Sequence, residues 1–344
     1  MTMHRLSYVV FAGCVFAGSV AAGAQVLPPQ TTPRMQADAN VPPAVAQAVN
    51  AAFPKDLLYK ILPEGEGAPV YPYQSCATMF RRGSDANPDL VAAAYSGAHT
   101  EIAMLSYSAG HASIVGAFTD RLSWFPGGSC EASIVNLADP AQPDSPLANA
   151  VQISFGGADW YFLWTGGKLL NVTAPYYEFG PNRPPYTDMA ESEAVDLDHS
   201  GPMQIVGRNG DWDKFPQDDG IEGTGTWTLF RYNGSAYAPA EKLQYFSDYS
   251  GWERRWPDQQ QINMRQWPAA TYELTVVNGS RDGKHRVVGA TITLNGRTIL
   301  SPSDVNKSVE TVSRTVILNK QNSIGVTLQG GKDARFYVLV KEPR

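Results

Sequence analysis

The 344-residue sequence has few charged residues, 17% in all, and no run of basic residues. Its formal net charge at pH 7 is −6. Nucleic acids and anionic membrane surfaces bind proteins through clustered Lys and Arg, so neither is expected as a partner. After residue 24, no apolar run approaches the ~20 residues of a membrane-spanning helix. The mature chain is therefore predicted to have no membrane span.

The sequence also lacks catalytic signatures. It has no G-x-S-x-G turn for a nucleophilic serine, and His99-Thr-Glu101 has no P-C-x-x-C partner with which to complete a deaminase zinc site. His111 and His199 have no neighbours at metal-ligand spacing. A glycosidase needs two carboxylates across a cleft, and acids such as Glu101 and Glu193 are not placed together by any motif. We predict no enzyme activity.

The N-terminus has the three parts of a cleavable signal peptide. A basic start at Arg5 precedes an uncharged run over Leu6–Ala22 and an A-x-A exit at Ala22-Gly-Ala24. We predict cleavage after Ala24 and a secreted or periplasmic protein. A membrane anchor is the alternative, but the run is short and interrupted by glycine. An acylated Cys14 is a further alternative, which leaves few apolar residues before the cut.

Cysteine is rare, with three in the chain. Removal of Cys14 with the signal peptide leaves Cys76 and Cys130, an even pair in an oxidising compartment. A Cys76–Cys130 disulfide is predicted.

Residues 25–54 are rich in Pro, Gln and Ala, with one short helix expected at Ala44–Phe53, and are predicted to form a disordered leader. Beyond them, Gly and Pro recur between short runs of Val, Ile, Tyr, Phe and Trp, which predicts many short strands. No long segment has the 3.6-residue apolar period of a helix. The fold class is therefore predicted to be all-β.

Three stretches of the chain share one order of strand, polar loop, strand, loop and strand. Their apolar anchors Leu90, Ile153 and Ile205 are spaced by 63 and 52 residues, a period typical of propeller blades. The third stretch contains Asp196-Leu-Asp198-His-Ser200-Gly201 and the strand Trp227-Thr-Leu-Phe-Arg-Tyr-Asn-Gly234. This pattern resembles the FG-GAP or VCBS repeats of extracellular β-propellers.

The resemblance implies a degenerate propeller-like repeat domain, which we assign to residues 55–267. Three repeats are fewer than the four to eight blades of most propellers. Either a further blade combines Leu57–Tyr73 with Gln244–Gln261, or the module is open. Residues 268–344 alternate in polarity and contain Asn295-Gly296, a strong hairpin signal. They are predicted to form a small antiparallel β-sandwich, and resemble the immunoglobulin-like modules of bacterial exported proteins.

The Asp196 loop is the predicted metal site. Side chains at alternating loop positions turn toward one hard cation, and a glycine permits the sharp turn that follows. Asp196, Asp198 and Ser200 are the expected calcium ligands, with Gln204 in place of a final acid. The alternative is an Asx-rich turn that bonds its own backbone.

Tryptophan offers a second predicted site. Strand alternation places Trp160, Phe162 and Trp164 on one face and Tyr161 and Leu163 on the other, where we expect them to pack between blades. By contrast, Trp212, Trp252 and Trp256 lie in polar surroundings and are the predicted ligand-binding residues.

These observations favour an exported non-enzymatic repeat protein that acts as a binding, adhesion or structural module, with calcium as its expected cofactor. Its partner would be an extracellular protein or glycan. The alternative is an extracellular carbohydrate-binding or carbohydrate-active protein.

Overall fold

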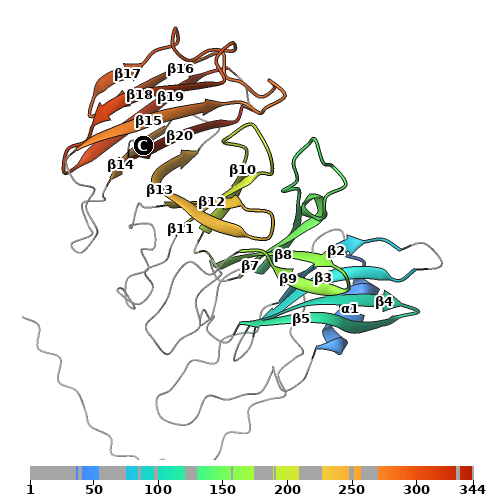
Figure 1. Cartoon of the computed structure of the whole chain (residues 1–344). Coiled ribbons are helices and arrows are strands. Elements are labelled where there is room, and N and C mark those ends of the chain that lie inside the picture. Colours follow the sequence, from blue (N-terminus) through green and yellow to red (C-terminus); the bar gives the residue numbers. More distant parts are fainter. Residues whose placement is uncertain are drawn as a thin grey trace, which may run out of the picture. The chain divides into compact units, whose positions relative to one another are not determined.

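A computed structural model describes residues 36–37, 41–53, 75–83, 87–96, 100–120, 130–155, 158–173, 189, 191–208, 227–247, 252–256, 270–330 and 334–342. Strands β1–β20 form four sheets (Figure 1), which confirms the predicted all-β class. Among these residues, no helix is long and apolar enough to cross a membrane.

The first sheet is an antiparallel meander with an added N-terminal strand. Its order is β1 (Gln36–Ala37), β2 (Ser75–Arg81), β3 (Asp89–Ser96), β4 (Thr100–Ser108) and β5 (His111–Asp120), with β1 parallel to β2.

Helix α1 (Pro43–Ala52) covers one face of this sheet. Val45 and Val49 pack on small side chains such as Ala93 and Ala103, which let a helix approach closely. The helix predicted at residues 44–53 is confirmed. The stretch predicted as a disordered leader thus includes a buried helical face, because its valines fall four residues apart on one side of the helix.

The second sheet repeats the up-and-down order with β6 (Cys130–Val135), β7 (Ala150–Phe155), β8 (Ala158–Thr165) and β9 (Lys168–Asn171). A 3-10 helix, η2 (Pro146–Asn149), precedes β7. Trp160 and Phe162 pack toward the first sheet, whereas Tyr161 and Leu163 pack toward residues of the third. The predicted division of β8 into two faces is confirmed, and the side chain of Trp160 is fully buried.

Two features hold the first and second sheets together. The predicted disulfide between Cys76 and Cys130 is present and joins β2 to β6. On β5, a Cβ at Gly116 would lie 2.8 Å from a ring carbon of Trp164. The glycine therefore lets the two sheets approach at this position.

The third sheet has seven strands and continues from the repeats into the C-terminal region. Its order is β10 (Glu191–Val195), β11 (Gln204–Arg208), β12 (Trp227–Tyr232), β13 (Tyr237–Ser247), β20 (Phe336–Lys341), β15 (Thr271–Asn278) and β18 (Thr311–Ile317). The first four strands form a third meander. Because β13 pairs with β20, the boundary predicted at residues 267/268 falls inside one continuous sheet.

The fourth sheet completes a C-terminal sandwich, which we define as β14–β20. Its order is β14 (Trp252–Trp256), β19 (Asn322–Gln329), β16 (Gly289–Leu294) and β17 (Arg297–Leu300). Leu274 and Val338 of the third sheet share a core with Ile292 and Ile324 of the fourth. Asn295 and Gly296 have φ of 53° and 77° in the turn between β16 and β17, as the predicted hairpin requires.

The further blade suggested by the repeats is not seen in the described part of the chain. Residues 57–73 lie outside that part, and the described residues of 244–261 belong to β13 and β14. Strand β14 pairs instead with β19 of the sandwich, with Trp252 opposite Val326 and Trp256 opposite Asn322. Within the described ranges, no strand pairing closes a barrel or a propeller ring.

Candidate functional site

The predicted calcium loop, residues 196–203, connects β10 to β11. It is closed by Gln204, whose Oε1 accepts hydrogen bonds from the backbone N–H groups of Leu197 at 2.7 Å and Asp198 at 3.1 Å. The Nε2 of the same side chain donates to the Pro202 carbonyl at 2.9 Å. Gln204 is only 3% exposed. The Gln204 side chain therefore stabilises the loop from within, because its amide oxygen accepts hydrogen bonds from the loop backbone and its amide nitrogen donates one.

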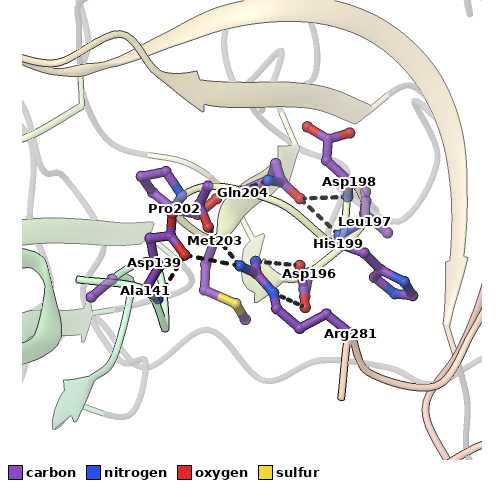
Figure 2. Close-up of polar contacts among 12 residues, drawn as sticks. Asp139, Ala141, Asp196, Leu197, Asp198, His199, Pro202, Met203, Gln204 and Arg281 are labelled. Atoms are coloured by element: carbon purple, nitrogen blue, oxygen red, sulfur yellow. Dashed lines mark hydrogen bonds and ion pairs between the residues drawn. The ribbon is translucent and has the colours of Figure 1, made fainter. Parts of the chain in front are cut away.

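Asp196 faces the side chain of Arg281, which lies in the turn after β15 (Figure 2). Nε and Nη2 of Arg281 donate to the two carboxylate oxygens of Asp196 at 2.8 and 2.6 Å. Nη1 donates to the Gly201 carbonyl at 3.0 Å and to Oδ1 of Asp139 at 3.3 Å. The hydrogen bonds to Asp196 raise the pKa of the Arg281 guanidinium above its usual value.

Asp198 faces a different arginine. Nε and Nη2 of Arg231, on β12, each donate to it at 2.8 Å. Arg231 also donates to Glu241 at 3.0 Å, and Glu241 accepts from Lys341 at 3.3 Å. The result is a chain of alternating charges across β12, β13 and β20. Hydrogen bonding to Asp198 is the main cause that raises the pKa of Arg231.

His199 adds a second side-chain contact between the loop and the sandwich, after that of Asp196 with Arg281. Its Nδ1 lies 2.5 Å from Oε1 of Glu310, whose Oε2 accepts from Arg286 at 2.7 Å. The hydrogen bond with His199 is the main cause that lowers the pKa of Glu310 below its ordinary 4.5. Glu310 immediately precedes β18, so the loop is held by side chains from two places in the sandwich.

The four predicted calcium ligands are not gathered on one point. Asp196 and Asp198 bind separate arginines, Gln204 binds the loop backbone, and Ser200 is exposed. Among the described residues, no group of three or more His, Cys, Asp or Glu side chains is placed to hold a metal ion. The loop does not follow the Asx-turn alternative either, since Gln204 takes the backbone N–H groups. Calcium binding stays a prediction.

No sequence motif marks the residues that pair with the side chains of this loop. Arg281, Arg231 and Glu310 were not among the predicted site residues. Arg281 is 85 positions from Asp196. The available signal was the charge balance, because a buried carboxylate requires a cation or several donors. That signal indicates the kind of partner without identifying it.

Two of the three predicted ligand-binding tryptophans lie among the described residues. Trp212 lies outside the described residues. Trp252 and Trp256 are on β14, where their backbones pair with Val326 and Asn322. Their role as ligand-binding residues stays a prediction.

Other acids lie in separate polar clusters. Asp159 accepts from Ser154 at 2.5 Å and Ser192 at 2.6 Å. The Ser192 hydroxyl lies 2.8 Å from that of Tyr161, whose pKa is raised chiefly by burial.

Glu193, one of the carboxylates considered for a glycosidase, accepts from Tyr245 at 2.7 Å and Ser247 at 3.1 Å. Glu101 lies on β4 of the first sheet, whereas Glu193 lies on β10 of the third. The described contacts do not bring these two acids together.

Comparison with known proteins adds little to this geometry. No family model matches the chain, and no curated protein matches it. Among solved structures, it is similar to an exo-β-1,3-galactanase from Phanerochaete chrysosporium with galactose, at 12% identity and a TM-score of 0.21. A variant of that enzyme with β-1,3-galactotriose gives 10% identity and a TM-score of 0.20. Each match covers 77% of this chain and 68% of the other. Likeness at this level carries no argument about fold or function.

Proposed function

We propose that this chain is an exported, non-enzymatic repeat protein whose stacked sheets and C-terminal sandwich form a binding or structural module. The observation that carries the proposal is the internal use of the loop acids. Asp196 and Asp198 are each held by two hydrogen bonds from an arginine of another element. The acidic loop at residues 196–203 therefore serves to join parts of the molecule.

This use of the acids differs from what acid–base catalysis requires. A general acid or base must reach the substrate and exchange a proton with it. Asp196 is 6% exposed, and both of its carboxylate oxygens already accept hydrogen bonds from Arg281. The Glu193 carboxylate is likewise occupied by two hydroxyl donors. These contacts support a structural role for Asp196, the predicted calcium ligand, and for Glu193, the acid considered for a glycosidase.

The architecture supports a module of repeated units. Three meanders, β2–β5, β6–β9 and β10–β13, follow one another in the same up-and-down order. Cores between the first and second and between the second and third bury large side chains such as Trp160 and Tyr161. Repeats of this kind bury their apolar faces on their neighbours. We propose that they form a degenerate propeller-like array outside the cytoplasm.

The test is a combined binding and hydrolysis screen of the chain from Gln25 onward. We expect no turnover of chromogenic glycosides and no defined hit on a glycan array, together with a recurrent extracellular protein partner after cross-linking. A glycan hit that is lost in Trp252→Ala or Trp256→Ala would instead support the carbohydrate-binding alternative. Hydrolysis that is lost in Glu193→Gln would contradict the proposal of a non-enzymatic protein.

A further inference from the structure

Strand β18 is the outermost strand of the seven-stranded third sheet, at the end opposite β10. It pairs with β15 in unbroken register over the seven residues Thr311–Ile317. In the described part of the chain, no strand lies on its other side. A strand in this position presents unpaired backbone N–H and C=O groups, which form a template for pairing with another chain.

The hydrogen bonds at the two ends of β18 define which of its residues face this open edge. The Leu318 N–H donates to the Ala270 carbonyl at 3.0 Å. At the other end, the Asn278 N–H donates to the Glu310 carbonyl at 2.8 Å. Successive residues of an antiparallel strand bond to opposite sides, so the even-numbered residues bond β15 and the odd-numbered ones turn their backbone groups outward. These outward-facing residues are all exposed, and are Thr311, Ser313, Thr315 and Ile317.

Two other edge strands of this protein are less suited to pairing. Val115 on β5 and Ile299 on β17 are extra residues, with no partner in the register of the neighbouring strand. Bulges of this kind disrupt the ladder and are one of the devices that blunt an edge. By contrast, β18 has neither a bulge nor a proline. Its edge is therefore regular enough to accept a further strand.

Arg314 is the one charged residue of β18, and its guanidinium lies at the open edge. Nη1 donates to the outward-facing Ser313 carbonyl at 3.0 Å, and Nη2 donates to Asp304 at 2.9 Å. The side chain is 44% exposed. A guanidinium has five N–H donors, so donors remain beyond these two contacts for a carboxylate that approaches along the edge.

This charge determines which chain is complementary to β18. If a second copy added its own β18 in antiparallel order with all the outward-facing residues paired, Thr311 would lie opposite Ile317, and Arg314 opposite Arg314 of that copy. Like charges directly opposite on neighbouring strands are destabilising, whereas opposite charges are favourable. The edge is therefore complementary to a strand that carries an acid at its central position, and not to itself.

We propose that β18 is a strand-addition site for an extended segment of another protein, which pairs antiparallel to it and places an Asp or Glu opposite Arg314. Backbone hydrogen bonds to the odd-numbered residues supply the affinity, as in other complexes where a peptide extends a sheet. The acid selects the segment by its charge. This inference rests on the proposed role as a binding module, and adds to it the surface and the chemistry of the partner.

The experiment uses the chain from Gln25 onward and capped synthetic peptides with the sequence of residues 311–317. One peptide carries the change Arg314→Glu and the other is unchanged. The changed peptide should bind roughly three- to tenfold more tightly, because opposite charges replace like charges across the strand pair. On binding, amide hydrogen exchange of the protein should slow at Ser313, Thr315 and Ile317. It should stay the same at Arg314, whose N–H already bonds β15.

Thr315→Pro is the most informative variant of the protein. It removes one outward N–H and leaves the bonds between β18 and β15 in place, since proline is tolerated where the N–H of an edge strand faces solvent. It should melt near the wild-type temperature and lose peptide binding, whereas Thr315→Val, the matched control that keeps the N–H, should bind as the wild type does. Arg314→Gln should bind both peptides equally. Should Thr315→Pro fail to fold, a peptide N-methylated at its odd-numbered residues lacks the same kind of bonds and should not bind the wild type.

The proposal is overturned if the wild type binds neither peptide, or binds both equally well. Binding that survives in folded Thr315→Pro or with the N-methylated peptide would show that no strand is added at β18. A concentration-dependent dimer of the wild type that Thr315→Pro abolishes would show that a second copy is the occupant. The proposed function fails on separate readouts, glycoside turnover or the absence of a cross-linked partner, so a partner captured at another surface would contradict this inference alone.

Discussion

Glu310 and His199 show how one contact ties the repeats to the sandwich. The side chain of His199 is 6% exposed and its Nδ1 bonds Glu310, while its Nε2 is buried with no hydrogen-bond partner. The backbone of His199 has a positive φ of 51°, a conformation that among residues other than glycine is found mainly for Asn, Asp and His. The sequence of the loop therefore suits this turn, which directs the His199 side chain to Glu310.

The lowered pKa of Glu310 predicts a pH dependence of stability. A carboxyl whose pKa is lower in the folded state stabilises it above the unfolded pKa, and this contribution is lost as pH falls through the folded value. Glu310→Gln should therefore flatten the fall in unfolding free energy that the wild type shows below about pH 5. His199→Asn, which removes the main partner and suits a positive φ, should flatten it as well. Urea unfolding followed at several pH values measures this, and a wild-type slope in both variants would count against the contact.

At the scale of elements, the loop at residues 196–203 depends on one side chain of the strand that follows it. Gln204→Met keeps similar bulk but removes the acceptor of the Leu197 and Asp198 N–H groups. We expect a loss of roughly 1–3 kcal/mol in unfolding free energy, the usual cost of leaving buried donors without a partner. Amide hydrogen exchange at these two residues should also become faster.

The control for this substitution is Gln329→Met, at the exposed end of β19. It makes the same chemical change where the side chain is exposed. Equal stability of the two variants, with unchanged exchange at Leu197 and Asp198, would show that Gln204 does not brace the loop.

Local patterns predicted individual elements well. Alternation along β8 assigned Trp160 and Tyr161 to opposite faces because side chains on a strand alternate whatever the strand packs against. The turn at Asn295-Gly296 was equally predictable, since positive φ angles are a property of these residues themselves. In the candidate site, the repeated acids predicted calcium ligands, and that remains a prediction. They did not predict that Asp196 pairs with Arg281, because Arg281 follows only after 85 positions and several strands.

At the scale of the whole molecule, strand pairing was the part that sequence patterns did not predict. The change of pattern near residue 268 suggested a domain boundary, yet β13 pairs with β20 and β14 pairs with β19 across it. Alternation defines the two faces of a strand but does not define which strand lies beside it. The sandwich therefore shares the third sheet with the repeats. Its first strand, β14, also precedes the predicted boundary in the sequence.

This continuity predicts that residues 268–344 do not fold alone. The fragment lacks β14 and leaves the β20 edge, normally paired with β13 from Leu243 to Ser247, open to solvent. An open edge of this kind favours association with other chains. Near-UV circular dichroism of the fragment should show no fixed aromatic environment, whereas the chain from Gln25 onward should unfold in urea as a unit. A monomeric fragment with its own cooperative transition would contradict the prediction.

The central claim is that Arg281 joins the sandwich to the repeats through Asp196, and a double-mutant cycle tests it most directly. The cycle compares unfolding free energies of the wild type, Asp196→Asn, Arg281→Met and the double variant. Each single change should cost roughly 3–5 kcal/mol, because it leaves a buried charge unpaired or uncompensated. The double variant should be more stable than the sum predicts, by a coupling energy of at least about 1 kcal/mol. Additive losses with no coupling would contradict the account.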